Sequence, residues 1–316
     1  MSEAELQTPD KLPKLLPRSL VRLVIAIHYV IQALHLPTSR QLEYVMCYLL
    51  HIKANRRLPV KRLLFNDVYF RVKTDGSLAR PLAVKVSDKE LVKQHVGEVL
   101  GPQHAVPTLA ILTSAAQVRA YDFPARCCIK PTHSCGQYIV RQNGEALNIK
   151  QIAGWLKFNF YGATFEANYR PLARKVIVER LAFDMIDPPD FKIHCVNGKA
   201  RMIEVVIRRT VDRTCLTYDT NWNRLPFTVA CKTMEEDVER PANLDAMIAA
   251  SEKLAAGFFL VRIDLYSDGK TFMVGEITNC PSGGLEPFWP AEGELHASHV
   301  MFSGVPPERW KEFFGT

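Results

Sequence analysis

The sequence lacks an apolar run long enough to cross a membrane. Its longest apolar stretch, residues 20–36, is shorter than the roughly 20 apolar residues that a membrane span needs. Polar or charged residues interrupt this stretch, namely Arg22, His28, Gln32 and His35. The first 18 residues are polar, acidic and broken by proline, so they do not resemble a secretion signal. We therefore expect a cytoplasmic protein in which residues 20–36 form a buried helix or a helix lying on a membrane surface.

The cysteines follow neither a metal-binding nor a disulfide pattern. Eight of them are scattered along the chain, without a C-x-x-C pair and without the cysteine–histidine spacing of a zinc site. His296 and His299 form an H-x-x-H pair without further ligands close in the sequence, and this pair is interpreted as structural. Because no export signal is visible, we expect reduced thiols in a cytoplasm.

Common catalytic motifs are also missing. The Gly-Lys-Thr of residues 269–271 has Asp264 where the first glycine of a P-loop would stand. The motifs G-x-G-x-x-G, G-x-S-x-G and H-E-x-x-H do not occur. Few aromatic residues accompany the basic ones near the N-terminus, which argues against nucleic-acid binding. These absences exclude the P-loop, Rossmann, α/β-hydrolase and zincin classes.

The composition is that of an ordinary globular protein with unevenly placed charge. The 316 residues are 47% hydrophobic and 23% charged, which suits two or three domains with packed cores. The net charge is +7, and residues 1–95 hold 16 Lys and Arg against 8 Asp and Glu. This basic N-terminal module suits contact with an anionic inner membrane face or an acidic polymer; a merely solvated surface is the alternative.

The chain begins with helical patterns and then alternates helices and strands. The clearest helices are expected at residues 19–36, 39–53, 88–100 and 241–257. Asn197-Gly198 predicts the turn of a β-hairpin. We therefore predict an α+β fold, with a basic helical module at residues 1–86 and two α+β units at 87–180 and 181–316. The two units meet at a seam near residue 180.

Charged residues stand within or at the ends of apolar strands, where an unpaired charge is costly. These residues are Lys130, Glu179, Lys192, Arg208, Arg209, Arg262, Asp264 and Glu276. A lysine at a strand end beside a loop of small residues, such as Lys130, can hold phosphate oxygens, although a surface lysine fits the same pattern.

Asp264 and Glu276 are candidates for a magnesium site, because Mg²⁺ prefers carboxylate, phosphate and water oxygens. The two residues lie on strands joined by a short connection. A two-residue turn at Asp268-Gly269 would place the carboxylates on opposite faces, so the hypothesis needs a wider loop or a β-bulge. The alternative is a local ion pair of Arg262 with Asp264 and a solvated Glu276, and the spacing alone leaves both open.

Several sequence blocks together resemble a known family. They are "DKELVKQHVG", "CIKPTHSCGQ", "VIVERL", "DFKIHCVNGK", "FFLVRIDLYSDGKTFMVGEIT" and "PSGG", in this order along the chain. The set is similar to ATP-grasp enzymes and, more narrowly, to the TupA-like branch linked to teichuronopeptide, capsule and other polysaccharide biosynthesis. The resemblance covers roughly residues 85–290. It implies an ATP-grasp fold, in which two α+β subdomains clasp ATP, preceded here by the basic helical module.

The resemblance also implies roles for individual residues. Lys89 and Lys130 match the lysines that bind the nucleotide phosphates. Ser134, Cys135 and Gly136 lie in the matching phosphate flap at residues 132–137. The adenine hinge and the ribose contact are matched by Glu179, Arg180, Leu181 and Asp187. Two Mg²⁺ ions are implied on Asp264 and Glu276, with Thr278 or Asn279 as a further ligand. The chain departs from the family pattern by a flap with one glycine and by threonine at position 278.

The activity implied by the resemblance is an ATP-dependent carboxylate–amine ligase that works through an acyl phosphate. Its substrates would be a uronic acid or acidic polysaccharide precursor and an amino acid or other amine. Arg262, Lys192, Arg208 and Arg209 would stabilise the reacting oxygens, and Ser282, Gly283 and Gly284 would bind a substrate carboxylate. A kinase that phosphorylates a sugar or small-molecule hydroxyl is an alternative. A module that binds nucleotide or glycan without turnover is another.

Overall fold

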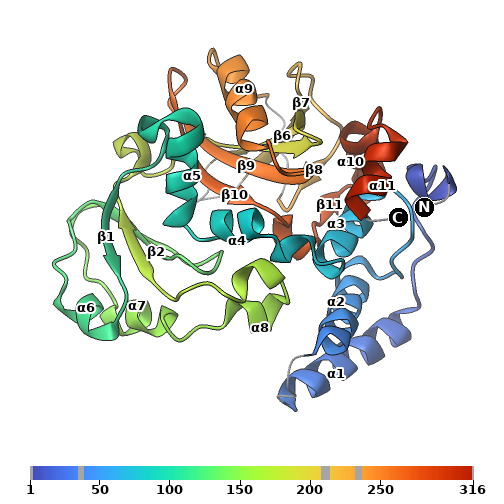
Figure 1. Ribbon diagram of the computed structural model, residues 1–316, viewed down its shortest axis with the longest axis horizontal. Helices are drawn as coiled ribbons and strands as arrows, with labels where there is room; N and C mark the ends of the chain where they lie inside the picture. The colour runs from blue at the N-terminus through green and yellow to red at the C-terminus, as the bar shows by residue number, and fades with distance from the viewer. Residues whose placement is uncertain (1–2, 35–38, 208–213, 232–236, 315–316) are drawn as a thin grey trace.

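The computed structural model describes residues 3–34, 39–207, 214–231 and 237–314. Two antiparallel sheets dominate it (Figure 1). The larger sheet has the strand order β10-β9-β5-β6-β7. Its strands are β5 (Asp190–Val196), β6 (Lys199–Ile207), β7 (Thr214–Asp219), β9 (Leu260–Ser267) and β10 (Phe272–Thr278). The smaller sheet, in the order β1-β4-β2-β3, consists of β1 (Thr108–Leu112), β2 (Cys127–Pro131), β3 (Ile139–Arg141) and β4 (Val176–Glu179). The described elements confirm a mixed fold of helices and sheets.

The alternation of side chains along the strands gives the larger sheet one apolar and one charged face. In β9, Val261, Ile263 and Leu265 lie in the main core, together with residues of β5 and β6. That core is closed by α4 (Pro81–Ser87), α5 (Leu91–Leu100) and α9 (Leu244–Leu254), which cover this face in Figure 1. Because successive side chains point to opposite faces, Arg262 and Asp264 must lie on the other face.

The smaller sheet has its own core, closed by α6 (Ala115–Ala120) and α7 (Ile149–Trp155). Short helix α8 (Phe160–Thr164) follows and lies beside the N-terminal helices in Figure 1. Residues from 87 onward were predicted to belong to the unit of the smaller sheet. In the structure, however, Val86, Val92 and Val96 are buried against the larger sheet. Helices α4 and α5 therefore pack with the larger sheet, and the domain boundaries near residues 87 and 180 stay predictions.

The N-terminal module consists of α1 (Arg18–Ala33), α2 (Arg40–Asn55) and α3 (Phe65–Thr74). Ser39 caps α2, because its side chain accepts a hydrogen bond from the Leu42 amide at the start of the helix. Helix α3 packs into a second core with α10 (Gly293–Phe302) and α11 (Pro307–Phe314), whereas α1 and α2 extend away from it (Figure 1). Within the described ranges, no helix is both long and apolar enough to span a membrane.

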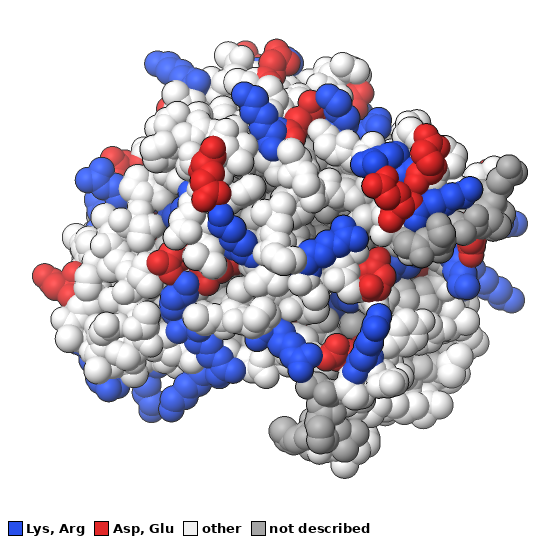
Figure 2. Space-filling view, in the orientation of Figure 1, with Lys and Arg blue, Asp and Glu red and all other residues white. Residues whose placement is uncertain are grey.

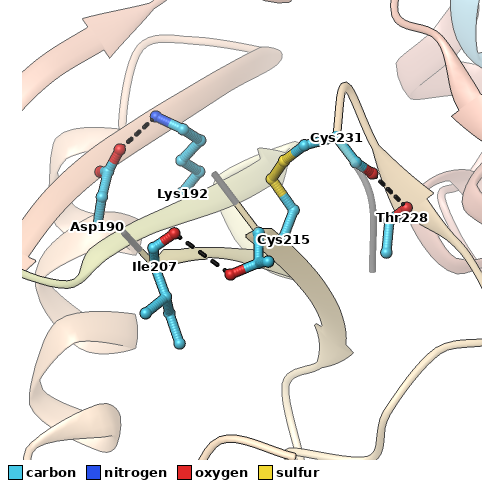
Figure 3. The surroundings of a disulfide bond; sticks show 7 residues. Asp190, Lys192, Ile207, Cys215, Thr228 and Cys231 are labelled. Carbon is cyan, nitrogen blue, oxygen red and sulfur yellow. Dashed lines mark hydrogen bonds and ion pairs between the residues drawn. A yellow bond between two sulfur atoms is a disulfide. The ribbon is translucent and has the colours of Figure 1, made fainter. Parts of the chain in front are cut away.

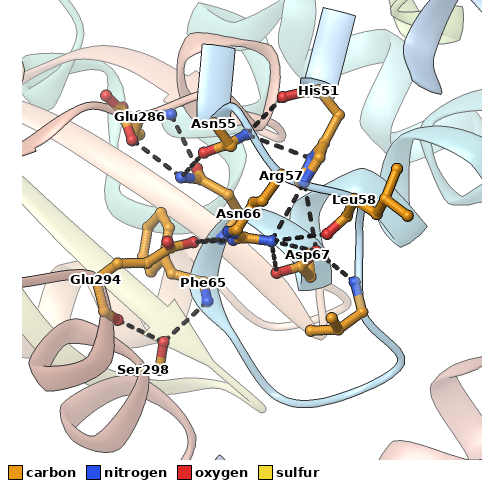
Figure 4. Close-up of polar contacts among 11 residues, drawn as sticks. His51, Asn55, Arg57, Leu58, Phe65, Asn66, Asp67, Glu286, Glu294 and Ser298 are labelled. Carbon is orange, nitrogen blue, oxygen red and sulfur yellow. Dashed lines mark hydrogen bonds and ion pairs between the residues drawn. The ribbon is translucent and has the colours of Figure 1, made fainter. Parts of the chain in front are cut away.

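A buried network of charges joins the N-terminal module to α10. The Arg57 guanidinium bonds to Asp67 at 2.8 Å and, through its other amino group, to Glu294 at 2.8 Å. Figure 4 shows Asn66 beside this network, where its side chain connects Asn55 with residue 286. All three charged side chains are nearly inaccessible to water, so each one depends on its partners for solvation.

One cysteine pair departs from the expectation of reduced thiols. Cys215 on β7 forms a disulfide with Cys231, which follows β8 (Thr228–Val229), as Figure 3 shows. Strand β8 pairs with β11 (Phe288–Trp289), and the Thr228 hydroxyl donates a hydrogen bond to the Cys231 carbonyl at 2.8 Å. The other six cysteines, all within the described ranges, are not in disulfide bonds. Nothing in the cysteine spacing indicated this pairing, because it depends on where β7 and β8 meet.

Candidate active site

A cavity of about 730 Å³ lies between the two sheets. Strands β2 and β3 and the chain that follows β4 form one wall, and β5, β9 and β10 form the other. Eight carboxylates and six Lys or Arg side chains line it. Charges so dense in a concave wall must be paired or must meet a charged ligand, because isolated buried charges are costly. The charged face of the larger sheet is therefore the floor of this cavity.

Three charged residues of the floor form one tight cluster. The Arg262 Nε and Nη2 atoms donate to the two oxygens of Asp264 at 2.7 and 2.9 Å. The Lys192 ammonium donates to Asp264 Oδ2 at 2.9 Å and also contacts Asp190 at 2.7 Å. Burial alone would raise the pKa of Asp264, but the charges of Arg262 and Lys192 outweigh it and hold that pKa well below its usual value. Asp264 is therefore ionised at neutral pH.

Glu276 stands directly opposite Asp264 on the neighbouring strand. The pairing of β9 with β10 shifts by one residue between Val274 and Glu276, so the bulge that the magnesium hypothesis required is present. Gly275 occupies the bulge, and a Cβ atom there would lie 2.8 Å from the Tyr266 ring. Because of this shift, Glu276 joins Asp264 in the wall of the cavity while Ile277 returns to the core.

Thr278 and Asn279 point in different directions. Thr278 is paired with Arg262 across the strands and lines the cavity, where its hydroxyl lies 3.4 Å from Glu276 Oε1. The Asn279 amide instead donates to the Ala83 carbonyl at 3.0 Å and to Ser87 at 3.1 Å, and thereby anchors α4. Of this pair of predicted ligands, only Thr278 is placed to contact a cavity ligand.

A second charged cluster lies at the smaller sheet. Lys130 Nζ contacts Glu179 at 2.6 Å, and Lys93 contacts the same carboxylate. Burial alone would lower the pKa of Lys130, but the Glu179 charge outweighs it and the pKa lies above its usual value. Lys89, also in the cavity wall, donates to the Ser134 carbonyl at 2.5 Å. Lys93 on α5 was not among the residues predicted from the sequence.

Beyond Glu179 the cavity becomes largely apolar. The walls of this end include Val106, Val140, Leu181, Met185 and Ile186. Arg180 and Asp187 line the same end, and the Arg180 amide donates to the Pro107 carbonyl at 3.0 Å. An apolar slot beside one carboxylate suits a flat base with an attached sugar.

The predicted phosphate flap borders the cavity through Cys135 and Gly136. Ser134 is buried, and its hydroxyl lies 3.3 Å from Gln137 Oε1. Gly136 adopts a positive φ of 77°, with open space around the position of a Cβ atom. Within the flap at residues 132–137, Thr132, His133 and Ser134 are buried, whereas Cys135 and Gly136 are exposed.

The backbone amides of the Ser282–Gly284 loop, which were predicted to bind a substrate carboxylate, are used within the loop itself. Ser282 and Gly283 line the cavity. However, the Gly283 amide donates to the Cys280 carbonyl at 3.0 Å, and the Gly284 amide donates to Pro281 at 2.8 Å. These two amides are therefore committed to the turn and do not form the expected nest for a carboxylate. Gly284 lies against α3, where a Cβ atom would be 2.9 Å from that of Tyr69.

Three charged residues at the end of the cavity near this loop were missed in the sequence. Glu286 is buried and contacts Arg262 at 3.5 Å, and its Oε2 atom has no hydrogen-bond partner among the described residues. Lys73 of α3 donates to the Gly283 carbonyl at 3.3 Å. Glu166 is buried in the same wall. Only Glu286 had a sequence signal, namely its position just after the small-residue loop.

The two missed carboxylates have raised pKa values. Burial and the charge of Glu204 raise the pKa of Glu286 to about 7, although Arg262 opposes the rise. Burial likewise raises the pKa of Glu166 to about 7, against the effect of Lys73. Such carboxyls can exchange a proton near neutral pH. Arg208 and Arg209, both predicted as catalytic, fall outside the described residues.

One family model and several solved structures resemble the chain. The model of the family described as TupA-like ATP-grasp matches residues 71–297. No curated protein matches the chain. Among solved structures, the chain is similar to a D-alanine–D-alanine ligase from Bacillus anthracis, with 16% identity and a TM-score of 0.40 over 73% of this chain and 71% of that one. An L-amino acid ligase from Bacillus licheniformis is 12% identical, with a TM-score of 0.42, over 78% of this chain and 58% of that one. The same Bacillus anthracis enzyme complexed with ATP is covered over 61% of its length, at 15% identity and a TM-score of 0.37.

Proposed function

Because the chain belongs to the TupA-like ATP-grasp family, we propose that it is a ligase that uses ATP to join a carboxylate to an amine. The observation that carries this proposal is the register of β9 and β10, which sets Asp264 opposite Glu276 in one cavity. The same cavity holds a lysine cluster at one end and two buried carboxyls of raised pKa at the other. The lysine cluster would bind the nucleotide, Asp264 and Glu276 would bind the metal, and the end with the two carboxyls would take the acceptor.

ATP fits the cavity with its base at the apolar end and its phosphates towards the floor. The slot beside Leu181 would take adenine, and Asp187 would face the ribose. Lys89 and Lys130 supply positive charge where the phosphates would lie, with Cys135 and Gly136 of the flap above them. The purine and the triphosphate thus have surfaces of matching chemistry.

Asp264 and Glu276 suit magnesium, because both offer carboxylate oxygens in the same wall. Within the described part of the chain, no group of three or more His, Cys, Asp or Glu side chains is arranged to hold a metal by itself. Phosphate oxygens of ATP would therefore complete the coordination, as is usual for Mg²⁺. When bound, the metal would neutralise phosphate charge and polarise the phosphoryl group.

The first chemical step would place an acyl phosphate next to Arg262. A substrate carboxylate oxygen attacks the γ-phosphorus of ATP, the bond to the bridging oxygen breaks, and ADP leaves. Negative charge gathers on the transferred phosphoryl group in this step. Arg262 and Lys192 are held by Asp264 at the centre of the floor, so they can stabilise that charge without rearrangement.

The second step needs a neutral amine beside the acyl carbon. The amine nitrogen attacks, forms the C–N bond, loses a proton, and phosphate leaves. The unpartnered Oε2 of Glu286 and the raised pKa of that carboxyl suit it to take up the proton. Lys73, near the same end, offers a cation to an acidic substrate. These contacts support an amine acceptor and an acidic donor, such as an amino acid and a uronic acid or acidic polysaccharide precursor.

Product analysis by ³¹P NMR tests the proposal. The protein would be incubated with ATP, Mg²⁺ and pools of uronic acids and amino acids, with Glu276→Gln as the control. We expect ADP and free phosphate that require both a carboxylate and an amine. A stable phosphorylated sugar would identify a kinase instead. AMP with pyrophosphate would contradict the ATP-grasp chemistry, and nucleotide binding without product in any pool would favour a binding module.

Lys130→Met is expected to weaken ATP binding by about 10- to 100-fold, because one charge-assisted hydrogen bond to phosphate contributes about 1.5–3 kcal/mol. Calorimetric titration with ATP in the absence of Mg²⁺ measures this effect directly. Lys150→Met is the matched control, since Lys150 is exposed on α7 of the same unit. Equal affinities of the two variants would remove Lys130 from the phosphate site.

A further inference from the structure

Helix α1 carries an apolar stripe that the structure leaves exposed. Its members Leu20, Leu23, Ile27 and Val30, with Leu34 directly after the helix, are each 41–60% accessible to water. At 100° per residue these positions share one side of the helix. Val21, Val24 and His28, on an adjoining side of the helix, are buried. A contiguous exposed stripe of this kind marks an interaction surface in a soluble protein.

The chain around this stripe is strongly basic. Residues 11–62 contain ten Lys and Arg and a single acidic residue, Glu43. Glu43 is itself engaged, because it contacts Tyr161 and lies 3.6 Å from Arg170. Several of the basic side chains are exposed and unmatched by a neighbouring acid in sequence, namely Lys11, Lys14, Arg18, Arg22, Lys61 and Arg62. Residues 11–62 therefore carry a large excess of positive charge.

The two properties meet on one side of the molecule. Figure 2 shows a largely uncharged area at the lower right, where α1 lies in Figure 1, with basic side chains at its border. Tyr29 is 55% exposed next to the stripe, and the Lys53 ammonium lies 4.8 Å above its ring. Apolar residues flanked by Lys, Arg and an exposed aromatic ring are the features of a helix that lies in a bilayer interface.

We propose that α1 docks this protein on an anionic lipid bilayer, with the stripe in the acyl boundary and the basic residues at the headgroups. A second copy of the chain is a less suitable occupant, because two equally basic modules would repel one another across the contact. An anionic membrane offers both an apolar layer and complementary charge. The inference stands independently of the ligase proposal, since it rests on residues outside the catalytic cavity.

Vesicle flotation tests the proposal with the full chain. The protein would be mixed with vesicles of phosphatidylcholine alone or with roughly one third phosphatidylglycerol. We expect flotation only with the anionic vesicles, and at least about a tenfold weaker association for Leu23→Gln/Ile27→Gln. Arg18→Gln/Arg22→Gln should also weaken vesicle binding. Added salt should weaken the binding of the unaltered protein, because it screens the attraction between the basic residues and the anionic headgroups.

Leu109→Gln is the matched control, because Leu109 is also partly exposed, at 39%, but lies on β1 of the smaller sheet. It should float like the unaltered protein. Absence of flotation of the unaltered protein would overturn the proposal, as would equal flotation of the α1 variant. A dimer in light scattering that the Leu23→Gln/Ile27→Gln change dissociates, without lipid binding, would assign the stripe to a second copy and also overturn it.

Discussion

Asp264→Asn is expected to lower the rate of ADP release by about 10²- to 10³-fold, the usual effect of removing one preorganised electrostatic group from an active site. The substitution keeps the shape of the side chain but removes the charge that faces Arg262 and Lys192. It also removes one of the two opposed carboxylates, so Mg²⁺ should no longer tighten ATP binding. Calorimetric titration with ATP, with and without Mg²⁺, measures that second effect without any acceptor substrate.

Asp268→Asn is the matched control for this variant. Asp268 lies in the exposed turn of the same hairpin, where its Oδ1 atom accepts the amides of Lys270 and Thr271, and asparagine can accept the same bonds. We expect full activity and an unchanged effect of Mg²⁺. If Asp264→Asn retained the magnesium-dependent tightening of ATP binding, Asp264 would not be a metal ligand, and the ion-pair interpretation of the β9 charges would stand.

The pH dependence of stability gives a second readout of Asp264. Burial opposes ionisation of this residue, but Arg262 and Lys192 lower its pKa below the value of the unfolded chain. Between the two pKa values the unfolded state binds more protons, so the free energy of unfolding rises with pH there. The contribution is therefore complete above about pH 4 and is lost as the pH falls further. The acid side of a stability curve should be flatter for Asp264→Asn than for the unaltered protein.

The floor of the cavity could be predicted from the sequence because it follows local rules. Alternation along β9 fixes Arg262 and Asp264 on one face and Val261 and Ile263 on the other. The need for a bulge before Glu276 followed from strand geometry alone, and the shifted register confirms it. The family and its fold were likewise visible, because the matching blocks are contiguous stretches of chain.

The acceptor end could not be predicted, because long-range packing creates it. Glu286 is fixed by Asn66, which is 220 positions away and exchanges two hydrogen bonds with its backbone at 2.9 and 3.0 Å. Lys73 lies on α3, a helix within the range that was predicted to be a separate N-terminal module. The loop amides of Gly283 and Gly284 were misjudged for the opposite reason: a local turn uses them, although the small residues suggested a ligand nest.

Arg57→Met is expected to destabilise the protein by about 3–5 kcal/mol, the usual cost of leaving buried charges without their partner. The change removes the only cation between Asp67 and Glu294 in the network of Figure 4 and keeps most of the side-chain volume. Chemical denaturation at neutral pH measures the loss. Arg56→Met is the matched control. The Arg56 side chain is partly exposed, and the hydrogen bonds described for this residue involve its backbone N–H and C=O.

The destabilisation caused by Arg57→Met should also depend on pH. Burial raises the pKa of Asp67 to about 7 even though Arg57 opposes the rise. Without Arg57 that pKa must increase further, so the folded state holds a proton that the unfolded state loses above about pH 4. Stability is then lost as the pH rises, and the variant should be closer to the unaltered protein at pH 5 than at pH 8. A pH-independent loss would show that Arg57 acts through packing and not through its charge.

The same network is connected to Glu286 in the cavity through Asn66, so Arg57→Met should also affect the rate of the reaction. Glu294 Oε1 accepts both the Arg57 guanidinium at 2.8 Å and the Asn66 amide at 3.1 Å, and Asn66 in turn holds the backbone of Glu286. If the variant is assayed at neutral pH and at a temperature where it remains folded, the step that needs the amine should slow more than ATP binding weakens. Equal effects on both would mean that the N-terminal module supports the fold alone and does not position the acceptor end of the cavity.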